Sequence, residues 1–567
     1  MPAVSKRVAV IGAGPSGLVT IKELVDEGHD PTCYERAAGL GGVFRFDERE
    51  GVVWESCRLT SSGLLMAFSD FPAEAGEAAH MSVGAYVQYL ARYCETFDLS
   101  RRIRFGTTVE SVTQEPDGGW RVRSAGRDGT RHEERYDAIA VCSGLNQSSH
   151  LPHVPGQETY TGTIVHGSQY RRAEPMRGKR VLVVGGGESA ADIVDEVSRL
   201  AAETVLSLRR GVAVLPRRRR GRPTDYSICR LNHSSPHWVS QTRHPADAGK
   251  RRVYRTLFMP LVIFGRPVQV ATTFLHEILP LFHPRGLMRG RAGLAEIRLA
   301  LKERRLILQL RQESGGNIQE QFGTKTTGFV TAIAAGRCRR AGQIVRFKGD
   351  RVHFQDGCSF EPDVVVFCTG FEVRLPFLDD DLSQTPRYLH AVNPAVGVSL
   401  GFIGFVRPAH GAVPPLAELQ ARWLALLHSG KVALPSQGDM REWIDRFAGI
   451  RRHRLRAVRG RLEHLVDYTS YCDELASHVG CKPTLTAVRR ESLGFRLRFF
   501  AALFASAQYR LVGPHAKPAI ARQVIAGLPV TRGLPMLSRL YVRWKLSRLL
   551  HRVLGTEYAP KLDLKLE

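Results

Sequence analysis

The apolar positions of this chain repeat one arrangement twice. Residues 7–11 (RVAVI) and 179–184 (KRVLVV) are mainly apolar runs of strand length, and each run ends in a glycine-rich turn. Apolar positions at helical spacing follow each turn, over residues 18–24 and 191–200. The pattern therefore predicts two strand-turn-helix units, and such a unit opens a nucleotide-binding α/β domain.

Further strand and helix patterns lie between and after these units. Helical spacing predicts a helix over residues 83–97, and Pro-Asp-Gly-Gly at 116–119 predicts a hairpin turn. Other predicted strands are residues 31–34, 103–112, 120–124, 136–141, 204–208 and 364–367. We expect an α/β fold with two Rossmann-like dinucleotide-binding domains, an insertion and a helical C-terminal region.

The first turn has the residues that a dinucleotide site requires. Gly12 permits the tight turn, Gly14 lets the backbone approach a pyrophosphate, and Gly17 lets the helix pack on the strand. Pro15 and Ser16 complete this turn and belong to the predicted site. Glu35 ends the second strand about 20 residues later, where a carboxylate accepts a hydrogen bond from a ribose hydroxyl.

The second turn has a similar glycine-rich pattern, but the strand that follows it ends in different residues. Its predicted cofactor-binding residues are Gly185, Gly187, Ser189 and Ala190. The next strand ends in Arg209 and Arg210 instead of an acid, and cations suit a ribose 2′-phosphate. These arginines favour NADPH over NADH, although arginines at a surface also serve solubility alone.

Length and composition indicate a globular protein with several domains. The chain has 567 residues and 63.0 kDa, and its 43% of hydrophobic residues suffices for two or three cores. Its longest apolar run, residues 257–265, has nine residues and includes Pro260, so we expect no membrane-spanning helix. The N-terminal residues lack a secretory signal pattern. These features predict a cytoplasmic protein.

Cysteine spacing and charge exclude other classes. The ten cysteines include no C-x-x-C pair and no zinc-type spacing, which argues against disulfide reductases and structural metals. The net charge of +25 is spread along the chain, which favours a solvated basic surface over a specific nucleic-acid partner. Peripheral contact with a membrane stays open as an alternative, and no oligomeric state is predicted.

The segment between the two units resembles a known family fingerprint. Residues 160–170 read aromatic-x-Gly-x-x-x-His-x-x-x-Tyr, with Gly162, His166 and Tyr170 at the fixed positions. This string is similar to the linker of class B flavin monooxygenases, which include flavin-containing and Baeyer-Villiger monooxygenases. The resemblance implies that FAD occupies the first site, and that Gly41, Gly42 and Phe44 lie along the flavin.

A second block resembles the flavin-containing monooxygenases but departs from them. Residues 68–72 match the family's Phe-x-Asp-Phe-Pro. Thr60 stands where the family has an asparagine thought to contact the oxygenated flavin, and residues 63–64 are Gly-Leu where it has Lys-Glu. Thr60 is therefore a candidate catalytic residue, with a capping or turn threonine as the alternative.

The resemblance extends to about residue 530. Thr369 and Gly370 look like the turn that leads back to the FAD domain, so both are predicted to bind cofactor. Residues 401–408 and 417–423 match the family's G-x-V-Q-P and E-x-Q-x-R-W blocks, with Arg407 where glutamine is common. The implied domains are FAD-binding (1–155), NADPH-binding (156–215), insertion (216–295), NADPH-binding return (296–333), FAD-binding (334–440) and helical (441–567).

The resemblance implies one reaction sequence. NADPH reduces FAD, O2 forms a C4a-hydroperoxyflavin, and one oxygen atom passes to a small soft nucleophile, an amine nitrogen or a sulfide sulfur. Thr60 and His166 are the candidate catalytic residues, His166 through the geometry of the joint. Baeyer-Villiger oxygenation of ketones, an uncoupled NADPH oxidase and a flavin-bound scaffold or membrane-surface protein are the alternatives.

Overall fold

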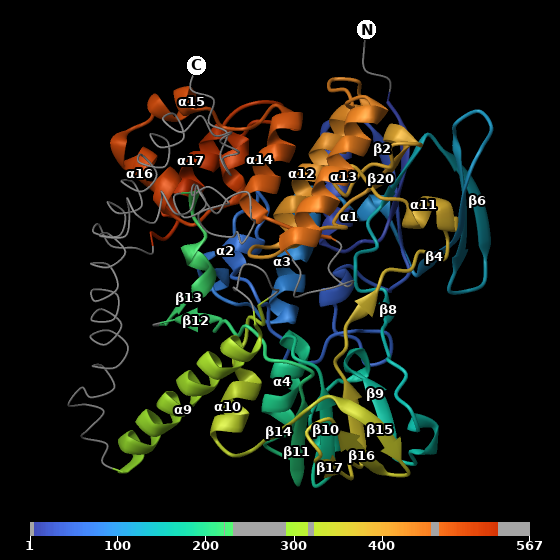
Figure 1. The fold of residues 1–567 in the computed structure, drawn as a ribbon. Helices are drawn as coiled ribbons and strands as arrows, with labels where there is room; N and C mark the ends of the chain where they lie inside the picture. Colours follow the sequence, from blue (N-terminus) through green and yellow to red (C-terminus); the bar gives the residue numbers. More distant parts are fainter. Residues whose placement is uncertain (1–4, 220, 231–290, 316–322, 455–463, 531–567) are drawn as a thin grey trace.

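Two parallel β-sheets, one in each half of the molecule, organise the computed structural model (Figure 1). It describes residues 5–219, 221–230, 291–315, 323–454 and 464–530. The predicted α/β class with two dinucleotide-type sheets is confirmed. The sequence also indicates an apolar run interrupted by prolines at 257–282 and a basic amphipathic helix at 534–554, and both segments lie outside the described residues.

The first sheet has the strand order β20-β7-β1-β2-β3, with every neighbouring pair parallel. Strand β1 is buried on both faces, which explains its continuous apolar sequence. Val8 and Val10 pack with helices α1, α3 and α12, whereas Ala9 and Ile11 pack with the meander β4-β5-β6 around Trp120. The bounds are β1 Arg7–Ile11, β2 Asp30–Glu35, β3 Ile103–Phe105, β4 Thr107–Gln114, β5 Trp120–Gly126, β6 Arg131–Tyr136, β7 Ala138–Val141, β20 Leu400–Phe402, α1 Pro15–Asp26, α3 Val83–Thr96 and α12 Val413–His428.

The second sheet has the order β14-β11-β10-β18-β9 and is also parallel throughout. Val181 and Val183 of β10 face helices α4 and α10, and Leu182 faces the small antiparallel sheet β15-β16-β17. Helix α9 extends from this half (Figure 1). The bounds are β9 Thr163–His166, β10 Arg180–Val184, β11 Glu203–Ser207, β14 Arg339–Ala341, β15 Ile344–Lys348, β16 Arg351–Phe354, β17 Ser359–Phe360, β18 Val364–Phe367, α4 Glu188–Val197, α9 Arg291–Glu313 and α10 Gly328–Ala334.

The chain returns to the first sheet later than the sequence indicates. The predicted boundary at residue 334 is wrong, because β14 and β18 both pair within the second sheet. The chain crosses back only after Phe367, through β19 (Phe371–Glu372), which pairs with β8 (Ser148–Ser149). Strands β15, β16 and β17 lie between β14 and β18 and form an antiparallel sheet instead of a strand-turn-helix unit. Local sequence patterns therefore do not show that this segment belongs to the second unit.

The C-terminal helices pack on the first sheet's unit. Leu475 of α14 and Phe504 share one buried cluster with Tyr86 of α3 and Leu416 of α12. This region holds α13 Gln437–Arg454, β22 Leu465–Val466, α14 Tyr468–Val479, α15 Leu485–Arg489, α16 Leu493–Ala501 and α17 Pro518–Gly527. Shorter elements elsewhere are α2 Gly63–Met66, β12 Arg218–Arg219, β13 Arg222–Pro223, α11 Asp380–Gln384 and β21 Arg407–Pro408.

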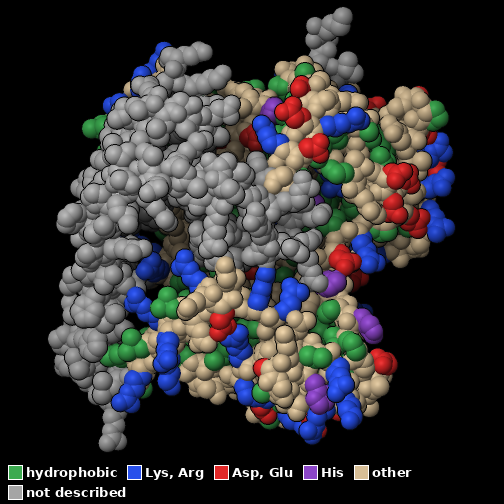
Figure 2. Space-filling model, viewed as in Figure 1, with side chains coloured by type: hydrophobic (Ala, Val, Ile, Leu, Met, Phe, Trp, Pro, Cys, Tyr) green, Lys and Arg blue, Asp and Glu red, His purple; other side chains and the backbone are tan. Residues whose placement is uncertain are grey.

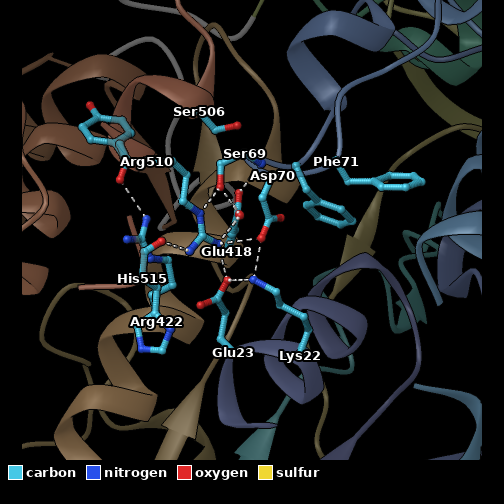
Figure 3. A network of polar contacts seen from close by, with 12 residues as sticks. Lys22, Glu23, Ser69, Asp70, Phe71, Glu418, Arg422, Ser506, Arg510 and His515 are labelled. Atoms are coloured by element: carbon cyan, nitrogen blue, oxygen red, sulfur yellow. Dashed lines mark hydrogen bonds and ion pairs between the residues drawn. The ribbon is translucent and has the colours of Figure 1, made fainter. Parts of the chain in front are cut away.

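A buried network of charged side chains joins this C-terminal region to the first unit (Figure 3). The Arg510 guanidinium lies at its centre and contacts the carboxylate of Glu23. Its Nη2 also lies 3.0 Å from a Glu418 oxygen and 3.5 Å from an Asp70 oxygen. Lys22 of α1 places its Nζ 2.6 Å from the same Asp70 oxygen. The network therefore fixes the helix after the first turn to α12 and to the C-terminal region.

Basic and acidic side chains are both present on the face drawn in Figure 2. They are interspersed over the meander β4-β5-β6, while Lys and Arg predominate on the half that holds the second sheet. Within the described part of the chain, no helix combines the length and the apolar composition needed to cross a bilayer.

Candidate functional site

The first glycine turn is packed too closely for larger residues. Gly12 has a φ of +105°, and a Cβ there would lie 3.0 Å from the carbonyl oxygen of Cys142. A Cβ on Gly17 would overlap the carbonyl oxygen of Gly12. At Gly14 the nearest atom to a Cβ is the Cα of Gly42 at 3.5 Å. Gly12 and Gly17 thus shape the turn, and Gly14 presents open backbone to the cavity.

Glu35 is held in a fixed orientation beside this turn. One carboxylate oxygen accepts a hydrogen bond of 2.7 Å from the backbone N–H of Ala13, and the other accepts one of 2.8 Å from Ala37. The side chain is buried but lines the cavity. Each oxygen retains a second lone pair, so the carboxylate is set to accept from a ribose hydroxyl.

The segment after Glu35 folds over the first turn. Gly41 and Gly42 have φ values of +119° and +55°, which glycine adopts without strain. The Phe44 ring packs edge-on against Tyr86, with ring centroids 4.8 Å apart. Gly42 and Phe44 line the cavity, whereas Gly41 makes the turn and does not line it.

The second turn mirrors the first. Gly185 has a φ of +138°, and a Cβ there would overlap the carbonyl oxygen of Cys368. No described atom lies within 4 Å of a Cβ built on Gly187, so a ligand can approach its backbone. Among the described residues no side chain caps α1 or α4, which leaves their first N–H groups to an anion. Ala190 is buried beneath this turn and does not line the cavity.

Arg209 and Arg210 follow the carboxyl end of β11. Both side chains are exposed and line the cavity, as does Ser189 of the second turn. The partial burial of its guanidinium, and then the neighbouring charge of Arg209, lower the pKa of Arg210. Two adjacent cations at this edge suit the 2′-phosphate that the sequence predicts.

Replacing Arg209 and Arg210 together by Ala is expected to raise KM for NADPH by about 10- to 100-fold, because charge-assisted bonds to the 2′-phosphate are lost. KM for NADH should change by less than about twofold, since NADH lacks that phosphate. Steady-state rates of NADPH and NADH oxidation, recorded over a range of nucleotide concentrations, give both KM values. Equal increases for NADPH and NADH would contradict the assignment.

The linker fingerprint lies at the joint between the sheets. The hydroxyl of Tyr160 donates to the carbonyl of Pro362 at 2.9 Å, and Tyr170 donates to Glu196 of α4 at 2.8 Å. A Cβ on Gly162 would overlap the Tyr160 ring end, which explains the glycine. Strand β9 of this linker pairs with β18, so the fingerprint forms the edge of the second sheet.

His166 ends β9 and lines the cavity. Its Nδ1 accepts from the backbone N–H of Ser168 at 3.1 Å, and its ring meets Phe371 edge-on at 5.2 Å between centroids. Burial lowers the pKa of His166, with the backbone of Gly370 acting in the opposite direction. The ring contacts both the linker and the segment after β18, so His166 is placed to hold these two segments in a fixed relative position.

Thr60 lies half-buried in the cavity wall. Two contacts fix the residues that follow it: Ser61 Oγ donates to the carbonyl of Gly411 at 3.0 Å, and the N–H of Ser62 donates to Asp225 at 2.5 Å. The backbone around Thr60 is therefore held from two sides. Thr60 lines the same cavity as the two glycine turns.

Thr369 and Gly370 follow β18 and line the cavity too. The Thr369 hydroxyl donates to the carbonyl of His150, so it orients the chain at this crossing. Gly370 has a φ of +86°, which permits the turn toward β19.

One cavity of about 1200 Å³ connects all these positions. The carboxyl ends of strands from both sheets open on it, as in other doubly wound folds. The structure places these predicted residues in its wall: Gly12, Gly14, Pro15, Ser16, Glu35, Gly42, Phe44, Thr60, His166, Gly185, Gly187, Ser189, Arg209, Arg210, Thr369 and Gly370. Gly17, Gly41 and Ala190 lie behind it, where their small size allows close packing. The open backbone at Gly14 and Gly187 and the uncapped helices fit two dinucleotides.

The cavity wall also includes residues that the sequence did not single out for binding. Lys325 lies beside the second turn, next to Thr324, whose hydroxyl donates to the carbonyl of Gly186 at 2.5 Å. Arg407 begins β21, and His464 directly precedes β22, the strand that pairs with β21. Lys325 belongs to no motif, and the only signal for Arg407 was its departure from the family's glutamine.

The sequence matches one protein family over most of its length. The profile of the family described as Flavin-binding monooxygenase-like matches residues 5–234 and 313–539.

Three relatives are similar over nearly the whole chain. A 4-hydroxybenzoate brominase (decarboxylating) of Marinomonas mediterranea is 34% identical, covering 92% of this chain and 93% of the relative. A protein of the same name from Pseudoalteromonas luteoviolacea is 32% identical, covering 97% and 98%. The mouse (Mus musculus) flavin-containing monooxygenase 5 is 30% identical, covering 95% and 94%.

Two solved structures share the fold. An S-allyl-L-cysteine S-oxygenase from Allium sativum has a TM-score of 0.57 at 23% identity, covering 85% of this chain and 90% of that chain. A cyclohexanone monooxygenase from Rhodococcus sp. Phi1, bound to NADP+, has a TM-score of 0.57 at 19% identity, covering 85% and 98%.

Proposed function

The chain belongs to the flavin-binding monooxygenase-like family, and we propose that it transfers one atom of O2 to a soft nucleophile, an amine nitrogen or a sulfide sulfur, with NADPH as reductant. The resemblance to flavin-containing monooxygenases is confirmed, and so is the predicted cofactor pair of FAD and NADP(H). The chain is a flavin-dependent monooxygenase. The preference for NADPH and the substrate class are parts of the proposal.

One observation carries the proposal: the carboxyl edges of both sheets open on a single cavity. A nucleotide in each turn would direct its reactive end into shared space, so hydride can pass directly between the two cofactors. Reduced FAD supplies the chemistry of oxygen activation. The protein's own residues orient both groups and exclude water from the space between them.

Each part of the chain has a defined task in this proposal. Glu35 and the first turn hold the FAD ribose and pyrophosphate, while the second turn with Arg209 and Arg210 holds NADPH. Thr60 donates a hydrogen bond beside the reacting oxygen, from a backbone fixed by Ser61 and Ser62. His166 holds the linker and the segment after β18 in a fixed relative position at the joint between the sheets.

Replacing Thr60 by Val is expected to lower the product formed per NADPH by about two- to tenfold, because one hydrogen-bond donor is lost without a change in shape. Released hydrogen peroxide should rise by the matching amount, and the FAD content should stay that of wild type. Parallel assays of product, peroxide and NADPH consumption measure this. An unchanged ratio would assign Thr60 a packing role only.

Bromination of an aromatic acid is a second candidate. Two relatives named 4-hydroxybenzoate brominase (decarboxylating) are 34% and 32% identical over nearly the whole chain. Bromide is itself a soft nucleophile, and its oxidation by one oxygen atom gives an electrophilic bromine species that attacks a phenol ring. The same cavity can therefore support either outcome.

A substrate panel with the FAD-loaded protein separates these functions. Tertiary amines, aryl sulfides, cyclic ketones and 4-hydroxybenzoate with bromide are each incubated with NADPH under ¹⁸O2. Labelled N-oxide or sulfoxide supports the first proposal, and brominated phenol supports the second. Lactone as the sole product, or peroxide alone in every reaction, would contradict both.

A further inference from the structure

The loop of residues 47–51 in the first unit makes a tight turn in the cavity wall. The carboxylate of Asp47 accepts two backbone hydrogen bonds of 3.0 Å from within the loop. A Cβ on Gly51 would lie 2.7 Å from the carbonyl oxygen of Asp47, so the turn requires a glycine there. Asp47, Glu50 and Gly51 line the cavity, as does Phe44 shortly before them. The loop therefore forms part of the wall that the first unit contributes.

The second unit contributes a short 3-10 turn, Gly167–Gln169, to the wall of the same cavity. This turn directly follows His166 at the end of β9. Ser168 Oγ lies 2.9 Å from His166 Nδ1 and 2.7 Å from the Oγ of Ser149 in β8. Because β8 pairs with β19 where the chain crosses between the units, the turn belongs to the joint between the two sheets.

The side chain of Arg171 joins the loop of the first unit to the turn of the second. Its Nε donates to the carbonyl of Glu48 at 3.0 Å, and its Nη2 donates to the carbonyl of Gly51 at 2.6 Å. Its Nη1 donates to the carbonyl of Ser168 at 2.6 Å and to that of Tyr170 at 3.1 Å. All four acceptors are backbone carbonyls. One half-buried guanidinium therefore fixes the main chain of one unit against the main chain of the other.

Other contacts hold the same two segments together. The N–H of Glu55 donates to the carbonyl of Arg171 at 3.1 Å. Ser56 Oγ donates to the carboxylate of Glu196 in α4 of the second unit. A substitution of the Arg171 side chain leaves these contacts in place. We therefore expect it to change the spacing of the loop and the turn without separating the units.

We propose that Arg171 is a positioning residue, which holds the two cavity walls at the separation that hydride transfer from NADPH to FAD requires. This inference rests on the proposed function, because it needs both cofactors in the one cavity. Hydride transfer needs reacting atoms about 3–3.5 Å apart, and a misplacement of about 1 Å costs on the order of 100-fold in rate. A guanidinium suits this task, because its planar fork fixes the directions of several hydrogen bonds and a lysine ammonium does not.

The test compares Arg171→Gln with Arg172→Gln in the FAD-loaded protein. Arg172 provides the matched control, because it joins the same linker to the same segment only through exposed ion pairs with the side chains of Glu48 and Glu55. Anaerobic stopped-flow measurements over a range of NADPH concentrations give the limiting rate of flavin reduction and the Kd of NADPH.

Arg171→Gln should lower the limiting rate of flavin reduction by about 10- to 100-fold and change the Kd of NADPH by less than about threefold. Arg172→Gln should match wild type in both constants. Dithionite should reduce the flavin of all three proteins at the same rate, since it does not depend on the second nucleotide site. If Arg171→Gln does not retain FAD, Arg171→Lys takes its place and should show a smaller decrease in the same limiting rate.

A titration without turnover keeps the outcome independent of the reaction. The flavin is reduced with dithionite, NADP+ is added, and the long-wavelength charge-transfer absorbance of a nicotinamide stacked on reduced flavin is recorded. Wild type and Arg172→Gln should show this absorbance, and Arg171→Gln should lose most of it at saturating NADP+. If NADPH does not reduce the wild-type flavin, the proposed function fails, but this titration still decides whether Arg171 positions the cofactors.

Two results would overturn the inference. One is normal flavin reduction with full charge-transfer absorbance in Arg171→Gln, which would show that the guanidinium does not set the separation of the cofactors. The other is an equal loss in Arg171→Gln and Arg172→Gln, or slower reduction by dithionite as well, which would indicate a general loss of structure.

Discussion

Replacing Arg510 by Met is expected to lower the free energy of unfolding by about 3–5 kcal/mol, because one partner is removed from a buried ionic network. The guanidinium contacts Glu23, Glu418 and Asp70, and its Nε donates to Ser69 at 2.6 Å. A Met side chain fills a similar volume but removes the positive charge that the buried carboxylates of Glu23, Glu418 and Asp70 contact. Urea unfolding of the FAD-loaded protein measures the change.

A surface arginine supplies the matched control. Arg522 pairs with Glu491 at 2.8 Å, but its side chain is 52% exposed. Arg522→Met should therefore change the free energy of unfolding by less than about 1 kcal/mol. Unfolding midpoints that are the same in Arg510→Met and wild type would show that the network does not stabilise the fold.

Acid titration gives the same network a second signature. Burial favours the neutral form of Glu23, but the charges of Arg510 and Lys22 outweigh it and hold its pKa at about 2. The stabilisation is complete above the unfolded pKa of about 4.3 and is lost as the pH falls through the folded value. Wild type should lose stability across this window, and Arg510→Met should lose less.

Replacing Gly185 by Ala is expected to slow flavin reduction by NADPH about a hundredfold or more while FAD stays bound, because the strained φ and the steric overlap add up at one turn. Gly185 has a φ of +138°, and a Cβ would overlap the carbonyl oxygen of Cys368. The distortion is confined to the second unit, so the first turn keeps its geometry. Anaerobic stopped-flow bleaching of the flavin by NADPH measures the rate.

Two controls complete this experiment: reduction by dithionite, and a glycine-to-alanine variant at a position with open space. Dithionite should reduce the flavin of Gly185→Ala at the wild-type rate, since it does not use the second turn. A Cβ added to Gly84 of α3 would meet no described atom within 4 Å, so Gly84→Ala should leave both rates unchanged. Loss of FAD from Gly185→Ala, or normal reduction by NADPH, would contradict two separable sites.

The sequence predicts the parts of this protein that depend on local spacing. The two glycine turns, Glu35 and the arginines after β11 follow from strand, turn and helix patterns a few residues long, and all reach one cavity. Gly17 and Ala190 lie behind the wall because a glycine fingerprint combines residues that meet the ligand with residues that permit packing.

Local sequence patterns do not predict the contacts between segments that are distant in the chain. Arg510 meets Glu23 across 487 positions of the chain, and neither residue has a neighbour that signals the pairing. Lys325 and Arg407 line one cavity only because the two units close on it. The boundary after α10 was misplaced for a similar reason, since β14 and β18 pair with strands more than 130 residues earlier in the chain.

A single turnover tests the central claim that two nucleotide sites share one cavity for oxygen transfer. The FAD-loaded protein is mixed anaerobically with one equivalent of NADPH until the flavin bleaches, and is then mixed with oxygen and an aryl sulfide. The account predicts complete bleaching and close to one sulfoxide per NADPH, with little free peroxide. A flavin that NADPH does not bleach, or one that returns all its electrons as peroxide, would contradict it.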